Sequence, residues 1–303
     1  MNRSVAAGAF ALALLVSCTA EEAAPPASGG APAAGGVPTI AVTIEANRYL
    51  AARIGGERMR VIYPVPADAD PLLWEPDRAA VASLQGADLV LLNGAGLERW
   101  RDRVSLAPSK TVTLAEEYRS EWLTFAGTVE HQHGPEGAHT HTGADPHVWM
   151  DPLLAKRHAA RIAAELAARF PAHAAELRAR AAEVAADLDD LDRRLRDARA
   201  PGSAPLLANH PAYDYLARRY GWTIRSYDLD PETLPAAGLA LPGAPADAKW
   251  ILWESAPAPE VESAARALGY RSVVIAPCEH TPESGDWLEA MRANAARIAD
   301  LGR

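Results

Sequence analysis

The segment from Glu130 to Pro152 reads EHQHGPEGAHTHTGADPHVWMDP and separates two kinds of sequence. Before it, short aliphatic runs alternate with amphipathic stretches; after it, a long region rich in Ala, Arg, Glu and Leu begins. Aliphatic runs that alternate with helical patterns predict parallel β-strands covered by helices on both faces of a sheet. The segment itself therefore predicts a loop within a first α/β lobe.

The same segment carries five of the nine histidines of the chain. His131, His133, His139 and His141 form two H-x-H pairs among Gly, Pro, Thr and Ala, whereas His147 follows an Asp-Pro pair. Neutral imidazole is the commonest protein ligand for zinc and its neighbours among the transition metals. The pattern predicts a loop that collects metal beside a site that holds it. The alternative is a solvated polar loop.

Short strands are expected on both sides of this segment. The first set covers residues 39–44, 59–63, 88–92 and 111–114, and the second covers 205–208, 223–227, 250–253 and 272–275. Helical patterns lie between them and end at glycines, which are typical helix stops. We therefore expect an α/β fold with two parallel-sheet lobes.

An apolar stripe follows Pro171, a residue well tolerated in the first turn of a helix. It repeats at spacings of three, four and seven and consists of Leu177, Val184, Leu188, Leu191 and Leu195. It predicts a helix of ~28 residues, about 40 Å long, that packs across both lobes. A surface helix or a coiled coil is the alternative. The expected domains are an N-terminal lobe at 39–170 with a histidine-rich loop at 130–144, a linking helix at 171–200 and a C-terminal lobe at 201–303.

Residues 1–18 have the pattern of a bacterial lipoprotein signal peptide. Arg3 precedes an apolar run too short to span a bilayer, and the run ends in Leu15-Val16-Ser17-Cys18, which resembles a lipobox. Cys18 is therefore the expected lipidation site, with an ordinary secretory signal as the alternative. Residues 19–38, rich in Ala, Pro and Gly, are expected to form a disordered tether.

These features predict an exported lipoprotein anchored to a membrane, in the periplasm or on the cell surface. With Cys18 acylated, Cys278 has no partner for an internal disulfide. A formal net charge of -9 without a basic stripe argues against nucleic acid as a partner, and a monomer is expected.

Four segments are similar to those of the metal-binding solute receptors of ABC importers, a family that captures zinc or manganese. In chain order they are 87–100 (ADLV…NGAGLERW), 145–152 (DPHVWMDP), 210–221 (HPAY…YG) and 287–294 (WLEAMRAN). The resemblance covers nearly all of the chain after the tether. It implies two α/β lobes joined by one long helix, a metal between the lobes, an ABC permease as partner and no enzymatic activity.

The resemblance also implies His147 as the metal ligand of the first lobe and His210 as that of the second. The histidine-rich insert before His147 is similar to the loop of zinc-specific members. Two further ligands of the family are missing. Leu72 stands where the family has its first histidine, and Ala276 stands where it often has an aspartate.

Candidates to complete the metal shell follow the expected strands, where open α/β sheets place their ligands. They are Glu279, Cys278, His280, Glu75 and Glu254. A ligating Cys278 would favour zinc or copper(I), and otherwise it is a small buried hydrophobe. His158 and His173 fall on helical segments and are expected to face solvent.

Three functions remain open. The first is an extracytoplasmic lipoprotein that captures zinc for a metal importer; manganese is disfavoured because it prefers oxygen-rich shells. The second is a receptor scaffold without tight binding that acts as a metal buffer or surface interaction protein, as the replacements at Leu72 and Ala276 suggest. The third is a zinc hydrolase, which a weak similarity at His139 and His141 favours and the lack of an H-E-x-x-H motif opposes.

Overall fold

The computed structural model describes residues 36–67, 69–125, 129–132, 138–141 and 143–301. The expected signal peptide at 1–18, all but the end of the expected tether, and His133 lie outside these described residues. Across the part that is described, none of the helices is both long enough and apolar enough to cross a membrane.

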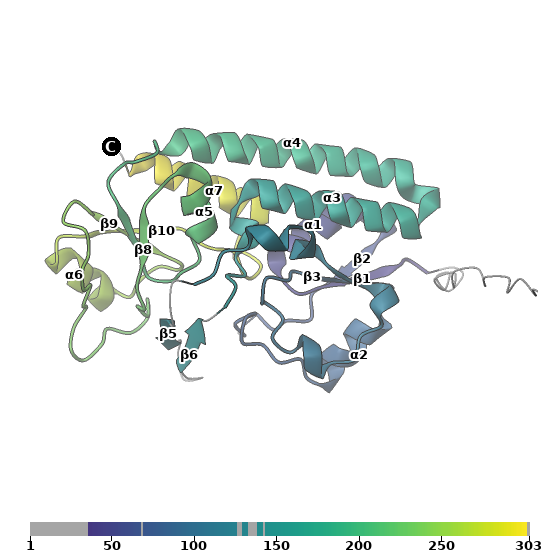
Figure 1. Ribbon diagram of the computed structural model, residues 1–303, viewed down its shortest axis with the longest axis horizontal. Helices are drawn as coiled ribbons and strands as arrows, with labels where there is room; N and C mark the ends of the chain where they lie inside the picture. The colour runs from purple at the N-terminus through teal and green to yellow at the C-terminus, as the bar shows by residue number, and fades with distance from the viewer. Residues whose placement is uncertain (1–35, 68, 126–128, 133–137, 142, 302–303) are drawn as a thin grey trace, which may run out of the picture. The chain divides into compact units, whose positions relative to one another are not determined.

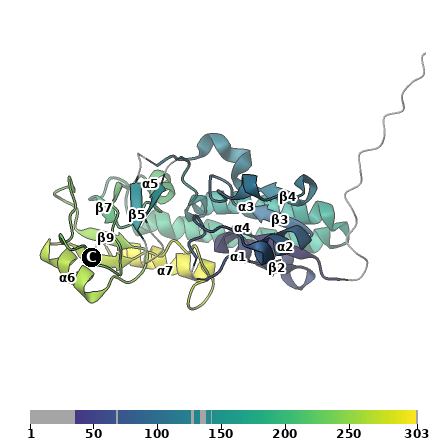
Figure 2. The same ribbon diagram turned by 90° about the horizontal axis from the view of Figure 1, so that it is seen from below.

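The first lobe is built on a four-stranded parallel sheet with the strand order β2-β1-β3-β4. Its strands are β1 (Thr39–Val42), β2 (Arg60–Ile62), β3 (Leu89–Leu92) and β4 (Thr111–Thr113). All four residues of β3 are buried, as expected for a strand covered on both faces. Helices α1 (Glu45–Gly55) and α2 (Arg78–Gly86) lie beside this sheet (Figure 2).

The second lobe repeats this plan with a parallel sheet of order β10-β9-β7-β8. Its strands are β7 (Leu206–Ala208), β8 (Ile224–Ser226), β9 (Trp250–Trp253) and β10 (Arg271–Val274), and its helices are α5 (Asp214–Tyr220), α6 (Pro259–Ala267) and α7 (Trp287–Asp300). In both sheets the strand that comes first in sequence lies between the second and the third. The expected fold of two parallel-sheet α/β lobes is confirmed.

Two long helices, α3 (Pro152–Arg169) and α4 (Ala174–Ala198), follow the first sheet and precede the second in the sequence. They run alongside one another (Figure 1). Helix α4 also contacts α1 of the first lobe and α7 of the second. It has 25 residues and begins three residues later than expected, because Pro171–His173 forms a separate 3-10 turn. All five apolar residues of its predicted stripe are buried. The boundaries of the linking helix at 171 and 200, and of the lobes, stay predictions.

A short antiparallel hairpin, β5 (Val129–Gln132) with β6 (Ala138–His141), precedes the segment that contains His147. In its register His131 pairs with His139. In the two segments that flank the hairpin in sequence, the N–H of Asp145 donates to the carbonyl of Leu123 at 2.8 Å. The Tyr215 hydroxyl accepts from the Leu123 N–H at 3.0 Å and donates to the Asp145 carbonyl at 3.1 Å. A tyrosine of the second lobe thus fixes the base of the histidine-rich loop.

One expectation about histidines is wrong. His158 lies on α3 but is fully buried, where its ring bonds to the side chain of Asn47 at 2.9 Å and to the Tyr118 hydroxyl at 2.5 Å. Burial lowers the pKa of His158 to about 3, so the ring is neutral at physiological pH. An amphipathic pattern does not distinguish the polar face of a helix from a buried position that supplies hydrogen-bond partners.

Glu98 organises the loop that follows β3. Its carboxylate accepts hydrogen bonds from the Thr43 hydroxyl at 2.6 Å, the Asn93 N–H at 2.7 Å and the Gly94 N–H at 3.0 Å. Gly94 has φ of 84°, a conformation that side chains rarely tolerate. Burial raises the pKa of Glu98, and the bonds from Thr43 and the main chain lower it. The segment therefore needs glycine at position 94 for its main-chain conformation and glutamate at position 98 as the acceptor of these hydrogen bonds.

Replacement of Glu98 by alanine is expected to lower the free energy of unfolding by about 2–4 kcal/mol, because it leaves three donors without their acceptor. Urea unfolding of the metal-free protein measures this difference. The control is Glu116→Ala, which removes an exposed ion pair with Arg119 and should change stability by less than about 0.5 kcal/mol. Equal stability of the two variants would contradict the role given to Glu98.

Candidate metal centre

His147 is fixed in space by contacts of the residues that surround it. The Asn93 side chain donates to the carbonyl of Pro146 at 3.0 Å. The carboxylate of Asp145 accepts from the His147 N–H at 2.9 Å. On the other side, Asp151 caps α3 by accepting from the Leu153 N–H. The Asp-Pro-His-x-Trp-x-Asp-Pro sequence is therefore a turn whose two aspartates both bind main-chain N–H groups.

His210 lies two residues after β7, at the carboxyl end of the second sheet. Asn209 beside it is buried and donates to Glu254 Oε1 at 3.1 Å, and the Glu254 N–H donates back to Asn209 at 2.9 Å. This reciprocal pair places Glu254 Oε2 at 3.9 Å from His210 Nδ1. This separation is an ion-pair distance and is longer than a hydrogen bond.

The third group comes from the turn after β10. Asn294 of α7 accepts from the Ala276 N–H at 3.2 Å and donates to the Ala276 carbonyl at 2.7 Å. The Trp149 indole donates to the carbonyl of Pro277 at 2.8 Å. These bonds fix the main chain just before Glu279. They also show what Trp149 and Asn294 do in the segments that resemble the receptor family: both hold this turn.

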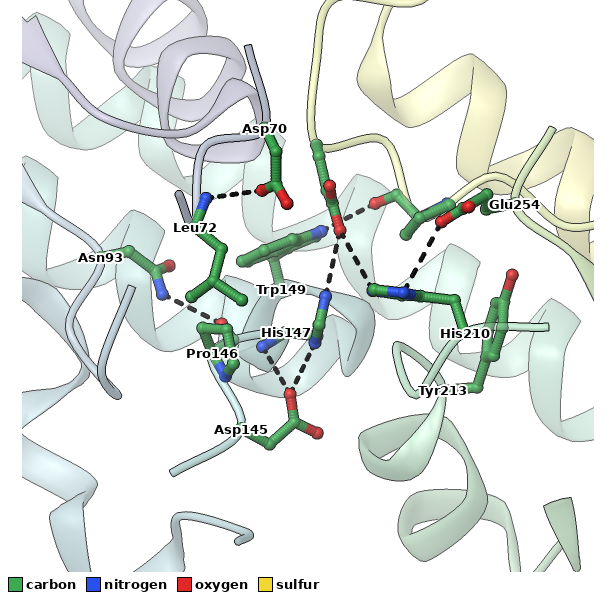
Figure 3. A network of polar contacts seen from close by, with 12 residues as sticks. Asp70, Leu72, Asn93, Asp145, Pro146, His147, Trp149, His210, Tyr213 and Glu254 are labelled. Atoms are coloured by element: carbon green, nitrogen blue, oxygen red, sulfur yellow. Dashed lines mark hydrogen bonds and ion pairs between the residues drawn. The ribbon is translucent and has the colours of Figure 1, made fainter. Parts of the chain in front are cut away.

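The structure brings His147, His210 and Glu279 together, with one donor atom of each within 4.8 Å of the others. Glu279 Oε1 is 3.0 Å from His147 Nε2 and 3.9 Å from His210 Nε2. The rings of His147 and His210 lie edge to face with their centroids 5.4 Å apart. Both rings are seen at the site in Figure 3. Donors on a zinc tetrahedron with bonds of about 2.05 Å would be about 3.3 Å apart. The two separations that involve Glu279 bracket that value, and the donor nitrogens of the two rings lie within 4.8 Å of each other.

A buried charge pair sets the protonation of His147. Its Nδ1 bonds to Asp145 Oδ1 at 2.6 Å, so Nε2 faces the other donors. Burial lowers the pKa of His147, but the charge of Asp145 and the hydrogen bonds to Asp145 and Glu279 outweigh it and raise the pKa to about 10. Without metal the ring is therefore a cation, and a metal ion at Nε2 must displace a proton.

Other expected candidates lie outside this group. Glu75 is a surface residue with a side chain 60% exposed and pairs with Arg103. Cys278 is buried, and its thiol donates to the Ala276 carbonyl at 3.4 Å. Burial raises the pKa of Cys278 to about 12, which opposes the thiolate that a metal requires. Neither joins the three donors, nor does His280. The assignment of ligands stays a prediction.

Leu72 stands at the position where the family has a histidine ligand, and its side chain has no atom that could bind a metal. Its side chain is buried in the same hydrophobic core cluster as Val148 and Trp149. Its N–H donates to Asp70 at 2.7 Å. The loop after β2 therefore contributes packing against the His147 turn, in place of a nitrogen donor.

Fold and donors together define a two-lobed α/β protein with a candidate metal centre at the carboxyl ends of both sheets. Residues 40–301 match the family described as "ZnuA: Zinc-uptake complex component A periplasmic". The chain belongs to this family.

Curated relatives carry related names. The high-affinity zinc uptake system protein ZnuA of Bacillus subtilis is 26% identical over 184 residues, which are 57% of this chain and 56% of the relative. The zinc-binding lipoprotein AdcA of Streptococcus pneumoniae is 27% identical over 191 residues, 61% of this chain and 38% of the relative. The chain thus spans about half or less of the length of these relatives. Both are named for zinc uptake or zinc binding rather than for an enzymatic activity.

Solved structures share the fold. The Zn(II)-bound ZnuA-like domain of S. pneumoniae AdcA aligns with a TM-score of 0.72 and 21% identity, covering 88% of this chain and 98% of that one. The metal-dependent lipoprotein YcdH of B. subtilis aligns with a TM-score of 0.73 and 22% identity, covering 87% and 98%. At these identities the likeness establishes the two-lobed architecture alone.

The raised pKa of His147 predicts proton-linked metal binding. Since the pKa of about 10 lies above neutral pH, each zinc ion bound at Nε2 should release one proton from this ring. The apparent affinity should therefore fall about tenfold for each pH unit between pH 8 and pH 6. Calorimetry at pH 7 in buffers of different ionisation enthalpy counts the released protons. His147→Ala should release fewer, and a parent protein that releases none would contradict this assignment.

Proposed function

We propose that this protein is an extracytoplasmic receptor that captures zinc between its two lobes and delivers it to the permease of an ABC importer. The observation that carries this proposal is the convergence of His147, His210 and Glu279 from separate parts of the chain. His147 and His210 are almost fully buried, and a bound metal ion would offset the cost of their desolvation.

The donor set favours zinc. Two imidazole nitrogens and one carboxylate oxygen are a common protein shell for Zn²⁺, with a fourth position left to water or another donor. Manganese prefers shells richer in oxygen. Three protein donors also suit a carrier, because cargo that is held too completely is released slowly.

The family description names a zinc-uptake complex and a periplasmic component, which supports an ABC permease as the partner. We expect this chain to act as a monomer that presents loaded zinc to such a permease. The expected lipid on Cys18 and the tether at 19–38 would keep the receptor near the membrane while its lobes face the aqueous side.

Zinc titration by calorimetry tests the proposal. The purified protein should bind one zinc ion tightly, and His147→Ala combined with His210→Ala should abolish that phase, because each substitution removes one nitrogen donor. Manganese is the comparison metal. The control is His173→Ala, which removes a histidine of the 3-10 turn before α4 and should leave the tight phase unchanged.

A weak binding of several equivalents that the double substitution leaves unaltered would contradict the receptor proposal. Binding would then reside in the histidine-rich loop, and the scaffold without tight binding would be the better description of the protein.

The anchor is tested separately. Cys18→Ser removes the thiol that a lipid would modify, so the protein should move from the membrane fraction to the soluble extracytoplasmic fraction of expressing bacteria. Cys278→Ser is the matched control and should remain with the membrane. A Cys18→Ser protein that stays in the membrane fraction would exclude lipidation at this residue.

A further inference from the structure

Glu279 belongs to the second lobe by sequence, since it follows β10, yet its main chain is bonded to the first lobe. We propose that Tyr63 and the Glu45–Thr281 pair are positioning residues that aim the Glu279 carboxylate at the two histidines. This inference rests on the proposed function, because it explains how the third ligand of the metal centre is held.

The first contact is made at the Glu279 carbonyl. The Tyr63 hydroxyl donates to this oxygen at 3.1 Å, and the Glu45 N–H makes a longer contact with it at 3.4 Å. Tyr63 follows β2 directly, and Glu45 is the first residue of α1. Two parts of the first lobe, the end of β2 and the start of α1, therefore contact the same main-chain carbonyl of the turn. Burial raises the pKa of Tyr63, so its hydroxyl remains a donor at every physiological pH.

The second contact lies two residues further along the turn. The Thr281 hydroxyl donates to Glu45 Oε2 at 2.9 Å. The Glu45 carboxylate is itself held by Arg48, whose Nε and Nη2 each donate to one of its oxygens at 2.6 Å. Glu45 is fully buried, and a bidentate arginine pair of this kind has a defined geometry. Thr281 is thus bonded to a carboxylate that cannot easily reorient.

The main chain just before these contacts is strained. Cys278 has φ of 57°, a left-handed conformation that residues other than glycine rarely adopt. Such a residue persists only where its surroundings determine the backbone on both sides. Here the Trp149 indole holds the Pro277 carbonyl before it, and Tyr63 holds the Glu279 carbonyl after it. The strained turn is what directs the side chain of Glu279 toward His147, at 3.0 Å.

The carboxylate is therefore positioned by the lobe that also carries His147, although it is encoded more than 130 residues later in the chain. Loss of the Tyr63 hydroxyl should loosen the turn without changing any donor atom. Zinc affinity should then fall through faster dissociation, because the ligand is still present but is less well aimed.

The test is a double-mutant cycle between Tyr63→Phe and Glu279→Gln, read by zinc affinity and by the dissociation rate. Phenylalanine keeps the ring and removes only the hydroxyl. Glutamine keeps the main-chain carbonyl that accepts the hydrogen bond from Tyr63, but it removes the charged carboxylate that would bind the metal. Tyr63→Phe should weaken zinc binding about fivefold in the parent, the usual effect of one lost hydrogen bond, and should have no further effect once residue 279 is glutamine.

Thr281→Val, which also preserves shape, should behave in the same way as Tyr63→Phe. The matched control is Tyr227→Phe, which removes a hydroxyl that donates to the Pro242 carbonyl in the second lobe, and it should leave zinc affinity unchanged. Unfolding of each metal-free variant shows whether the fold itself is weakened.

Three outcomes would overturn the inference. If Tyr63→Phe weakens binding equally with glutamate and with glutamine at 279, Tyr63 acts on the fold in general and does not position the ligand. If Tyr63→Phe leaves the parent affinity unchanged while Glu279→Gln lowers it, the receptor proposal stands and the inference fails. Zinc affinity that Glu279→Gln does not alter would instead overturn the assignment of Glu279 as a ligand, and the inference with it.

Discussion

One carboxylate, that of Glu279, stands between two imidazoles that come from different lobes, and the rest of the structure is arranged to keep it there. Its oxygen is 3.0 Å from His147 and 3.9 Å from His210. Without metal, a protonated His147 lies between the buried carboxylate of Asp145 and the partly exposed carboxylate of Glu279, and its charge compensates theirs. A divalent cation can take over that role, because it replaces the ring proton and satisfies the carboxylate directly. The same residues therefore serve a stable empty state and a stable loaded state.

The segments that resemble the receptor family do more than supply candidate ligands. Glu98 orders the loop after β3, and Asn93 in that loop holds the Pro146 carbonyl beside His147. Trp149 and Asn294 both hold the turn that leads to Glu279. A donor on a loose loop would contribute little affinity, because ordering it would cost conformational entropy. These supporting residues hold the candidate donors in place before a metal binds, so that less conformational entropy is lost on binding.

The fold was predictable from the sequence, because fully buried strands such as β3 appear as unbroken aliphatic runs and the α4 stripe repeats at helical spacing. The resemblance to the receptor family named His147 and His210 in advance, but Glu279 could not be separated from Glu75 or Cys278. That separation depends on contacts between distant residues, such as the bond from Trp149 to Pro277 and the positive φ of Cys278. His158 was misplaced for a related reason, since its burial depends on Asn47 and Tyr118 as partners.

A crystal structure of the zinc-loaded protein, with anomalous scattering recorded at the zinc edge, tests the central claim most directly. We predict one strong peak bonded to His147 Nε2, His210 and a Glu279 carboxylate oxygen, with bonds of about 2.0–2.2 Å. A peak bound only by His131, His139 or other histidines of the 130–144 loop, with no density between His147 and Glu279, would contradict it.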